Sequence, residues 1–299
     1  MGINNDNFIM LPTVDFCFKE LMKNPKVRKG FVGAILGKDP KIIRKTILVP
    51  TDLQKESEDD KLGILDVLVE LDDGAKMNME MQVPYFEFWT NRVLFYMGKV
   101  YVGQIKKGDD YDRLRKCIHV SILDFVHFPQ DQRCYRKIVF CDAETGAQYT
   151  DLLELHILEL RKLPAQDQNE DGIIRWMRFL GGKKREEFED MAKKDEYIEA
   201  AYDELKKLSL DEQKRLEYEL REKAIRDHNS LMKSAQRLGQ KRGEEIGEKR
   251  GEKRGERLAL KRLVGKKMEK GMSQDEIAEL LELEPDVVKE LADEWVREQ

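Results

Sequence analysis

Two acidic residues, Asp66 and Glu80, are the side chains in this sequence whose type and spacing first suggest chemistry. They lie on either side of the turn sequence Asp72-Asp73-Gly74, each within a run of alternating apolar residues. This pattern is typical of a β-hairpin. Carboxylates held together bind hard divalent cations such as Mg²⁺, which commonly takes one or two carboxylates together with water and a substrate phosphate.

The register of the hairpin decides whether the two carboxylates meet. A three-residue loop puts the left-handed conformation at Gly74 and makes Asp66 face Glu80 on one side of the sheet. The other side is then apolar, and it runs from Leu65 to Leu71 on the first strand. A two-residue loop would instead bury Asp66 among methionines without a partner, and we reject it for that cost.

Like charges that face each other across two strands, with their Cβ atoms roughly 5 Å apart, destabilise a bare sheet. A bound cation between Asp66 and Glu80 would remove that repulsion. Solvation of both acids on an exposed face, or protonation of one of them, would remove it too. The hairpin alone leaves these alternatives open.

Composition limits the classes of protein that this chain can represent. It has 299 residues and a formal net charge of -5, which argues against an obligate polyanion-coating protein but says nothing about a local basic groove. No apolar run is long enough to span a membrane, and the N-terminus lacks the regions of a secretory signal. The four cysteines and four histidines show no zinc or disulfide spacing. We therefore expect a cytoplasmic protein that does not bind membranes.

Several further elements must position the hairpin. Asp15 is expected in the first turn of a helix over residues 11–23 with Thr13 as its N-cap. An aromatic-rich helix over residues 85–105 should cover the hairpin, and it carries Arg92 on one side with Tyr96 and Lys99. The remaining expectations are a helix at 27–37, strands at 42–49, 117–125 and 136–142, a surface loop at 52–60 and an amphipathic helix at 151–160. The fold class is therefore α/β, a mixed sheet flanked by helices.

The C-terminal half is expected to be mostly α-helical. Residues 166–235 form a charged helical region, in which Ser209 to Glu212 is a capping box. Glycine recurs at every fourth position of residues 236–256, which predicts a linker or a frayed helix because each helical glycine costs about 1 kcal/mol relative to alanine. Residues 257–299 read as a small helical module, with Ser273 capping its second helix and Pro285 opening its third. The acidic last helix favours packing or homo-oligomerisation over entry into a DNA groove.

The order and spacing of several motifs resemble one known family. The motifs are Val14-Asp15-Phe16-Cys17-Phe18-Lys19, Leu65-Asp66-Val67, Met79-Glu80-Met81-Gln82, the aromatic helix, and the stretch from Lys107 to Leu123. Together they resemble the recombination-promoting nuclease / transposase-like family of the PD-(D/E)XK nuclease superfamily, over roughly residues 8–165. The resemblance implies a restriction-endonuclease-like core in a nuclease-like domain at residues 1–165.

The resemblance also implies roles for individual residues. Asp66 and Glu80 would be the acidic members of the nuclease signature and would hold the catalytic metal. Gln82 stands where most of the superfamily has lysine, and glutamine is neutral and limited to hydrogen bonding. Asp15 matches a recurrent position on the first helix of the family and is a further candidate catalytic residue, with Glu20 as a second candidate on the same helix.

The leading hypothesis is a metal-dependent DNA endonuclease that acts in DNA recombination and uses Mg²⁺, with Mn²⁺ as a substitute. Its site residues are Asp66, Glu80, Gln82 and Asp15, and the first two bind the metal. DNA is the expected partner, and a homo-oligomer through the C-terminal helices is a further expectation. The alternative hypothesis is a catalytically silent module with a nuclease fold that binds DNA or a protein partner.

Overall fold

The structure is a computed structural model that describes residues 8–53, 63–83, 85, 87–166 and 170–298. The chain divides into two compact units, Met1–Asn229 and Ser230–Gln299. The expected surface loop at residues 52–60 lies mostly outside the described residues. No helix of the described part is both long enough and apolar enough to cross a membrane.

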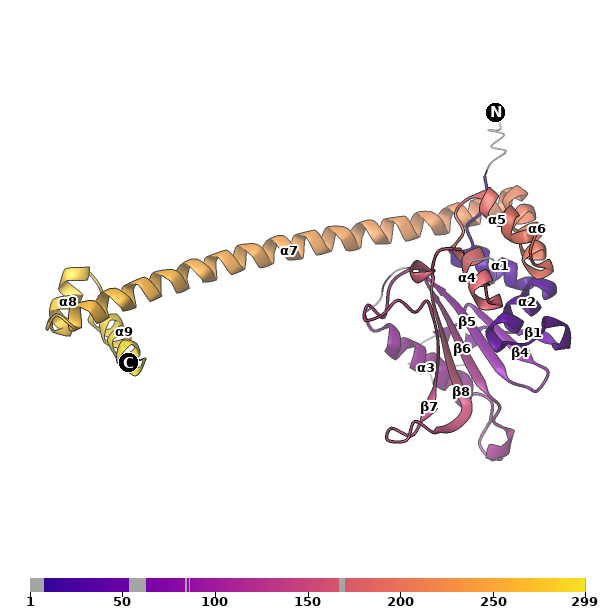
Figure 1. Cartoon of the computed structure of the whole chain (residues 1–299), viewed down its shortest axis with the longest axis horizontal. Coiled ribbons are helices and arrows are strands. Elements are labelled where there is room, and N and C mark those ends of the chain that lie inside the picture. The colour runs from indigo at the N-terminus through magenta and orange to yellow at the C-terminus, as the bar shows by residue number, and fades with distance from the viewer. Residues whose placement is uncertain (1–7, 54–62, 84, 86, 167–169, 299) are drawn as a thin grey trace. The chain divides into compact units, whose positions relative to one another are not determined.

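A six-stranded sheet forms the centre of the first unit (Figure 1). Its strands, in spatial order, are β1 (Thr46–Val49), β4 (Val67–Leu71), β5 (Lys76–Gln82), β6 (Cys117–Leu123), β8 (Gln148–Glu159) and β7 (Tyr135–Cys141). β5, β6 and β8 run parallel to one another, and the outer strands pair antiparallel. A separate two-stranded sheet joins β2 (Asp52–Leu53) to β3 (Gly63–Ile64). The sheet is mixed, as predicted.

The predicted hairpin is present with the predicted register. Val67 pairs with Met79 and Glu70 pairs with Lys76, and the amide of Leu71 donates to the carbonyl of Ala75 at 2.9 Å. The loop is therefore three residues long. Gly74 has φ = +80°, in the left-handed region that favours glycine, and this is the reason for glycine at the third loop position.

One part of the hairpin prediction is wrong. Leu65 does not continue the apolar face of β4, because the regular ladder begins only at Val67. The amide of Leu65 donates to the carbonyl of Thr51 at 3.0 Å. The side chain of Leu65 is buried on the opposite side of the sheet, in a cluster with Leu68 and Tyr96. The irregular backbone at residues 65 and 66 therefore reverses the alternation just before Val67.

Helices cover both faces of the sheet. α3 (Trp89–Val102) packs on the face that carries Leu65 and Leu68, as predicted for the aromatic helix. The other face is covered by the main core cluster, in which methionines of β5 meet apolar residues of six helices. These helices are α1 (Asp15–Lys23), α2 (Pro25–Leu36), α4 (Gly172–Gly181), α5 (Arg185–Ala192), α6 (Glu196–Leu210) and α7 (Glu212–Met268). Short 3₁₀ turns lie at Pro40–Ile42, Tyr111–Arg113 and Leu160–Lys162.

The two later strand predictions at 117–125 and 136–142 are confirmed as β6 and β7. Every residue of β6 is buried, as expected for a central strand. The amphipathic helix predicted at 151–160 is wrong, because those residues belong to β8. Apolar residues occur on both faces of β8 near its end, and a short apolar run does not distinguish a buried strand from a helix. Residues 42–45 precede β1, which starts at Thr46 rather than Ile42.

Two cap assignments also differ from the sequence prediction. Helix α1 begins at Asp15 with Val14 at its N-cap position, so Thr13 does not cap it. Ser209 lies inside α6, where its hydroxyl donates to the carbonyl of Leu205 and accepts from the amide of Met10. The carboxylate of Asp211 accepts from the amides of residues 213 and 214 and so begins the next helix.

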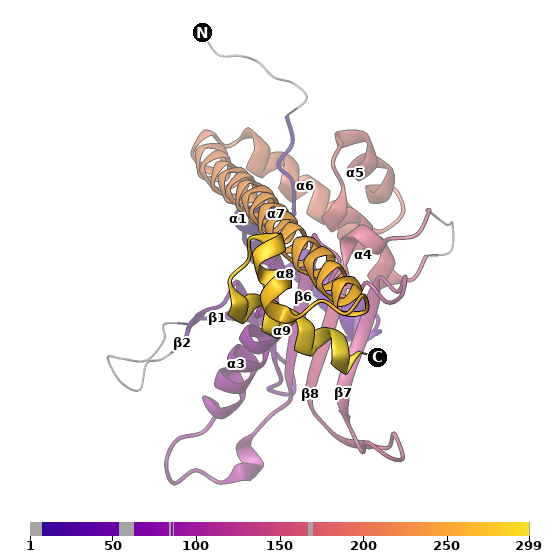
Figure 2. The ribbon, with the colours of Figure 1, turned by 90° about the vertical axis from the view of Figure 1, so that its left-hand side faces the viewer.

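The last helices include α7 (Glu212–Met268), α8 (Gln274–Leu281) and α9 (Pro285–Arg297). α7 belongs to the first unit up to Asn229. In the second unit, α8 and α9 lie against the end of α7 (Figure 2) around a small core that contains Val264, Ile277 and Val288. Ser273 forms the predicted capping box, and Pro285 opens α9 as predicted.

The glycine-rich residues 236–256 lie within α7. A Cβ added at any of the five repeated glycines would meet nothing within 4 Å, so close packing does not account for these glycines. Gly265 differs, because a Cβ there would lie 2.2 Å from the indole of Trp295. This glycine lets α9 approach α7 closely.

The first unit extends well beyond residue 165, where the sequence analysis placed the end of the nuclease-like domain. Residues of α4, α5 and α6 lie in the same buried cluster as β5 and β6, and this cluster reaches Tyr218 of α7. The charged composition of residues 166–235 therefore conceals a buried face. The six-stranded sheet and the helices α4, α5 and α6 therefore belong to one compact unit.

Candidate active site

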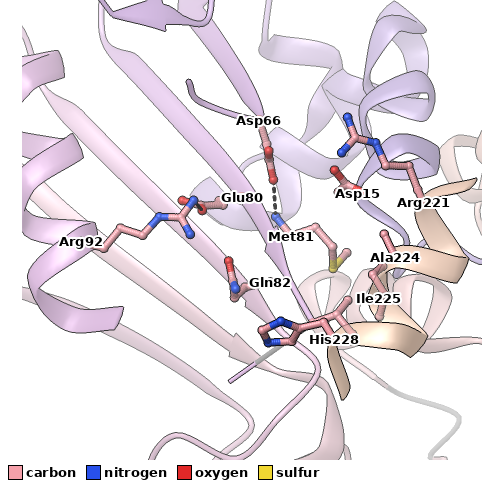
Figure 3. A pocket seen from close by; sticks show the side chains of 11 residues that line it. Asp15, Asp66, Glu80, Met81, Gln82, Arg92, Arg221, Ala224, Ile225 and His228 are labelled. Atoms are coloured by element: carbon pink, nitrogen blue, oxygen red, sulfur yellow. Dashed lines mark hydrogen bonds and ion pairs between the residues drawn. The ribbon is translucent and has the colours of Figure 1, made fainter. Parts of the chain in front are cut away.

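Asp66 and Glu80 lie together at the open end of the hairpin, where Figure 3 shows their side chains. Asp66 directly precedes β4, and Glu80 lies within β5. The Oδ2 atom of Asp66 accepts a hydrogen bond of 3.1 Å from the amide of Met81. This bond fixes the Asp66 carboxylate beside β5, next to Glu80, although the regular β4 ladder has already ended.

Glu80 is almost entirely buried, with 5% of its surface exposed. Its Oε1 atom lies 2.5 Å from Nη2 of Arg92, which reaches it from α3. Burial nevertheless raises the pKa of the Glu80 carboxyl to about 7, because desolvation of the charge outweighs the attraction of Arg92, and the nearby Asp66 raises it further. The Glu80 carboxylate is thus easily neutralised and would gain from a further positive charge.

Asp66 has a different cationic neighbour. The ammonium group of Lys19, from α1, lies 2.8 Å from its Oδ1 atom and 3.8 Å from Oδ2 of Asp15. Burial raises the pKa of the Asp66 carboxyl, and Lys19 and the Met81 amide only partly offset this effect. Lys19 therefore bridges Asp15 and Asp66.

Beneath Glu80, a row of buried polar residues lies along β5 and β6. His119 Nδ1 is 3.0 Å from Nδ2 of Asn78, and His119 Nε2 is 2.9 Å from the hydroxyl of Ser121. Burial lowers the pKa of His119 to about 3, so the ring is neutral at physiological pH. Both ring nitrogens have hydrogen-bond partners inside the fold, so we assign His119 a structural role between β5 and β6.

A cavity of about 280 Å³ opens beside the carboxylates (Figure 3). Asp15, Asp66, Glu80, Gln82 and Arg92 line one part of it, from α1, the hairpin and α3. The start of α7 lines another part. Its contribution consists of Arg221, Ala224, Ile225 and His228.

The structure brings together the four side chains that the sequence analysis selected, namely Asp66, Glu80, Gln82 and Asp15. Arg92 contacts Glu80 and lies over the ring of Tyr96, which is buried on the side of α3 that meets the sheet. Lys99 lies over the ring of Phe95.

Glu20 is held by Lys23 and Lys214 and does not line the cavity. Three basic residues near the carboxylates, Lys19, Arg221 and His228, were not predicted from the sequence. The spacing of Asp15 and Lys19, four residues apart on one helix, was a usable signal for Lys19. No local signal connected α7 to a hairpin more than a hundred residues earlier.

The donor atoms at the cavity fit a hard divalent cation. Asp66 and Glu80 offer carboxylate oxygens only, and these are the ligands that Mg²⁺ and Mn²⁺ accept. Within the described part of the chain, no group of three or more His, Cys, Asp or Glu side chains is arranged to hold a metal ion. An ion here would therefore need water and substrate oxygens to complete its shell, which is common for Mg²⁺.

Comparison with known proteins identifies the family. Residues 12–235 match the model of the family described as PD-(D/E)XK nuclease family transposase. No curated protein and no solved structure matches the chain. The matched segment includes the sheet, all the helices that cover it and the part of α7 that lines the cavity. The chain therefore belongs to the PD-(D/E)XK nuclease family of transposases, as the motifs of its sequence predicted.

Proposed function

We propose that this protein is a Mg²⁺-dependent DNA endonuclease that hydrolyses phosphodiester bonds, and that Mn²⁺ can replace Mg²⁺. The observation that carries the proposal is the partly buried carboxylate of Asp66 beside the buried carboxylate of Glu80, at a cavity in a chain of a nuclease family. A divalent ion supplies two effects in such chemistry: it lowers the pKa of water and neutralises charge on the phosphate.

In this proposal Asp66 and Glu80 hold the metal ion. The Met81 amide keeps Asp66 in place, and Arg92 orients Glu80 while leaving its second oxygen for other partners. Gln82 lies two residues after Glu80 on β5 and lines the same cavity. It orients the attacking water by hydrogen bonding, because a neutral amide neither takes a proton nor brings a charge.

Asp15 has a secondary role in this proposal. It lines the cavity but shares Lys19 with Asp66. Its carboxylate therefore helps to hold the Lys19 ammonium beside Asp66. Replacement of Asp15 by asparagine should reduce cleavage less than replacement of Asp66.

Cleavage of supercoiled plasmid in Mg²⁺ or Mn²⁺ tests the proposal, with the wild type compared with Asp66→Ala and Glu80→Gln. Both variants should lose cleavage by at least about 10², the scale on which loss of a catalytic group acts. Glu70→Gln is a matched control, because Glu70 lies on the same hairpin and pairs with Lys76 outside the cavity. Equal cutting by all four proteins would refute the site assignment.

The competing proposal is a catalytically silent module that binds DNA or a protein partner. The observation in its favour is that Lys19 and Arg92 already neutralise both carboxylates, while Gln82 is neutral. Absence of cleavage in every metal, together with retained DNA binding, would support this second function.

Residues 257–299 have a separate proposed role in homo-oligomerisation. The acidic α9 pairs with α7 through Arg257, which contacts Glu290 at 3.3 Å and Glu294 at 2.7 Å. These ion pairs neutralise two acidic side chains of α9 that would otherwise repel DNA. Light scattering on the full chain and on a chain that ends at residue 256 would measure the contribution of the module to assembly. We also propose that the enzyme acts on DNA in the cytoplasm, which cell fractionation would test.

A further inference from the structure

The face of α7 that lines the cavity has its own chemistry. Arg221, Ala224, Ile225 and His228 recur at intervals of three and four residues, so they share one side of the helix. We call these four residues the α7 wall. Figure 3 shows them across the cavity from Glu80 and Gln82, with Arg221 near one end, His228 near the other and the two apolar side chains between them.

The α7 wall is firmly attached to the first unit. Tyr218 is buried one turn before Arg221, and its hydroxyl accepts from the amide of Leu11 at 3.2 Å. The ring of Phe8 meets the Tyr218 ring edge to face, with centroids 5.9 Å apart. Ile225 packs against the main core. The wall therefore has a defined place beside the carboxylates.

Arg221 is a surplus cation at this cavity. Asp66 already pairs with Lys19, and Glu80 already pairs with Arg92. Among the residues that the structure describes, no carboxylate lies within ion-pair distance of Arg221 or His228. The Arg221 side chain is exposed, so its fork of donors is open to an anion from solvent. A guanidinium of this kind binds phosphate through two parallel hydrogen bonds.

The positions of Arg221 and His228 bear on the size of the ligand. Seven residues of α-helix advance about 10.5 Å, so the two side chains leave the helix two turns apart. Arg221 offers a charged fork of donors and His228 a ring N–H donor. Two phosphates of one strand suit such separate donors, with Ala224 and Ile225 facing the sugars between them. A mononucleotide offers phosphate at one end only.

We propose that the α7 wall binds the sugar-phosphate backbone of a nucleic acid strand and lays that strand along the carboxylate site, with Arg221 on one phosphate and His228 on a second phosphate of the same strand. This inference rests on the proposed DNA substrate and adds the surface that holds it. Sequence readout is not part of the role, because backbone contacts position a strand without reading its bases.

Fluorescence anisotropy with a labelled DNA duplex, in Ca²⁺ and over a range of salt concentrations, tests the proposal on the full chain. Arg221→Ala should weaken binding about tenfold at low salt, the equivalent of one lost charge-assisted hydrogen-bonded contact. The slope of log affinity against log salt should fall by about one, because one phosphate is no longer neutralised. Arg221→Lys should keep the slope and lose part of the affinity, since lysine is a point charge.

Arg226→Ala is the matched control. Arg226 is an exposed arginine on the same helix, five residues further along and on a different face, and its nearest acidic group is Glu222 at 3.9 Å. The Arg226→Ala substitution removes the same charge and leaves the four residues of the α7 wall unchanged. Equal effects of Arg221→Ala and Arg226→Ala on affinity and slope would overturn the proposal, since only net charge would then matter.

A length series separates the two ends of the wall. For single-stranded oligonucleotides of six nucleotides, the Arg221→Ala/His228→Ala variant should lose more binding affinity than either single variant. For dinucleotides, the double variant should lose no more affinity than the single variants. A difference independent of length would refute the spacing argument. If the endonuclease proposal alone is wrong, the wild type will not cleave DNA, but its DNA binding will still depend on Arg221. Wild-type cleavage with unchanged binding in Arg221→Ala would overturn the wall alone.

Discussion

Replacement of Glu80 by glutamine should make the metal-free protein more stable at neutral and alkaline pH. Glu80 is buried at the cavity, and burial raises the pKa of its carboxyl from 4.5 to about 7 in the folded state. The folded protein therefore favours the protonated form. Glutamine has the shape of that neutral form and carries no charge at any pH, so it removes the cost of a buried carboxylate.

The size and pH window of this effect follow from the two pKa values. A carboxyl with a raised pKa contributes its full stability below the unfolded value of 4.5, and this stability is lost as pH rises to about 7. The lost free energy of unfolding is on the order of 3 kcal/mol above pH 7. This value already includes the attraction of Arg92, which lowers the pKa of the Glu80 carboxyl. Wild type and Glu80→Gln should thus be similar near pH 4 and differ by about 3 kcal/mol at pH 8.

Urea denaturation at pH 4.5 and pH 8 measures the difference, with Trp89 and Trp176 as fluorescent reporters in the first unit. Glu70→Gln is the control on the same hairpin. The hydrogen bond from Lys76 lowers the pKa of Glu70, so this substitution should not stabilise the protein at pH 8. Mg²⁺ should stabilise the wild type and have little effect on Glu80→Gln. A Glu80→Gln variant that is no more stable than wild type at pH 8 would refute the reasoning.

Two other substitutions test packing and buried charge. Gly265→Ala should destabilise the second unit by about 1 to 3 kcal/mol in thermal unfolding, because the new methyl group would overlap the indole of Trp295. Gly251→Ala on the same helix meets nothing within 4 Å and should stabilise it by about 1 kcal/mol, so equal effects of the two alanines would contradict the packing argument. Lys162→Met should cost about 3 kcal/mol in chemical denaturation, because it leaves the buried carboxylate of Glu159 without the ammonium group 2.8 Å away. Addition of Glu159→Gln should recover part of that loss, and a further loss instead would show that the charge was not the cause.

The hairpin was predictable because two local signals agreed. Gly74 permits a left-handed third loop residue, and the alternation of apolar residues on both strands allows only one register without a buried, unpaired acid. That register predicted that Asp66 and Glu80 would lie together. Gln82 followed from the same alternation, since it lies on the same side of β5 two residues further on.

The failed predictions depended on partners distant in sequence. Residues 151–160 contain good helix formers, yet they pair with β6 on one side and β7 on the other, and this pairing decides their conformation. Thr13 and Ser209 both fit local capping patterns, but Ser209 is used to bind the amide of Met10, 199 residues away. Short-range patterns do not contain such contacts.

The α7 wall was beyond sequence reasoning for the same reason. Its residues lie in a stretch whose charged composition is typical of a solvated helix. The burial of Tyr218 and the packing of Ile225 against the main core show that one side of this helix meets the core. Arg92 was accessible to prediction because it follows the hairpin directly. Arg221 and His228 required the fold itself.

The late position of the α7 wall in the chain has a consequence for synthesis of the protein. A ribosome adds about 5 to 20 residues per second, so on the order of 10 s separate the emergence of β5 from that of His228. A nascent chain that already contains Asp66 and Glu80 still lacks one side of the cavity and the part of the core completed by Tyr218. The order of residues along the chain thus delays assembly of the complete cavity until most of the protein has been made.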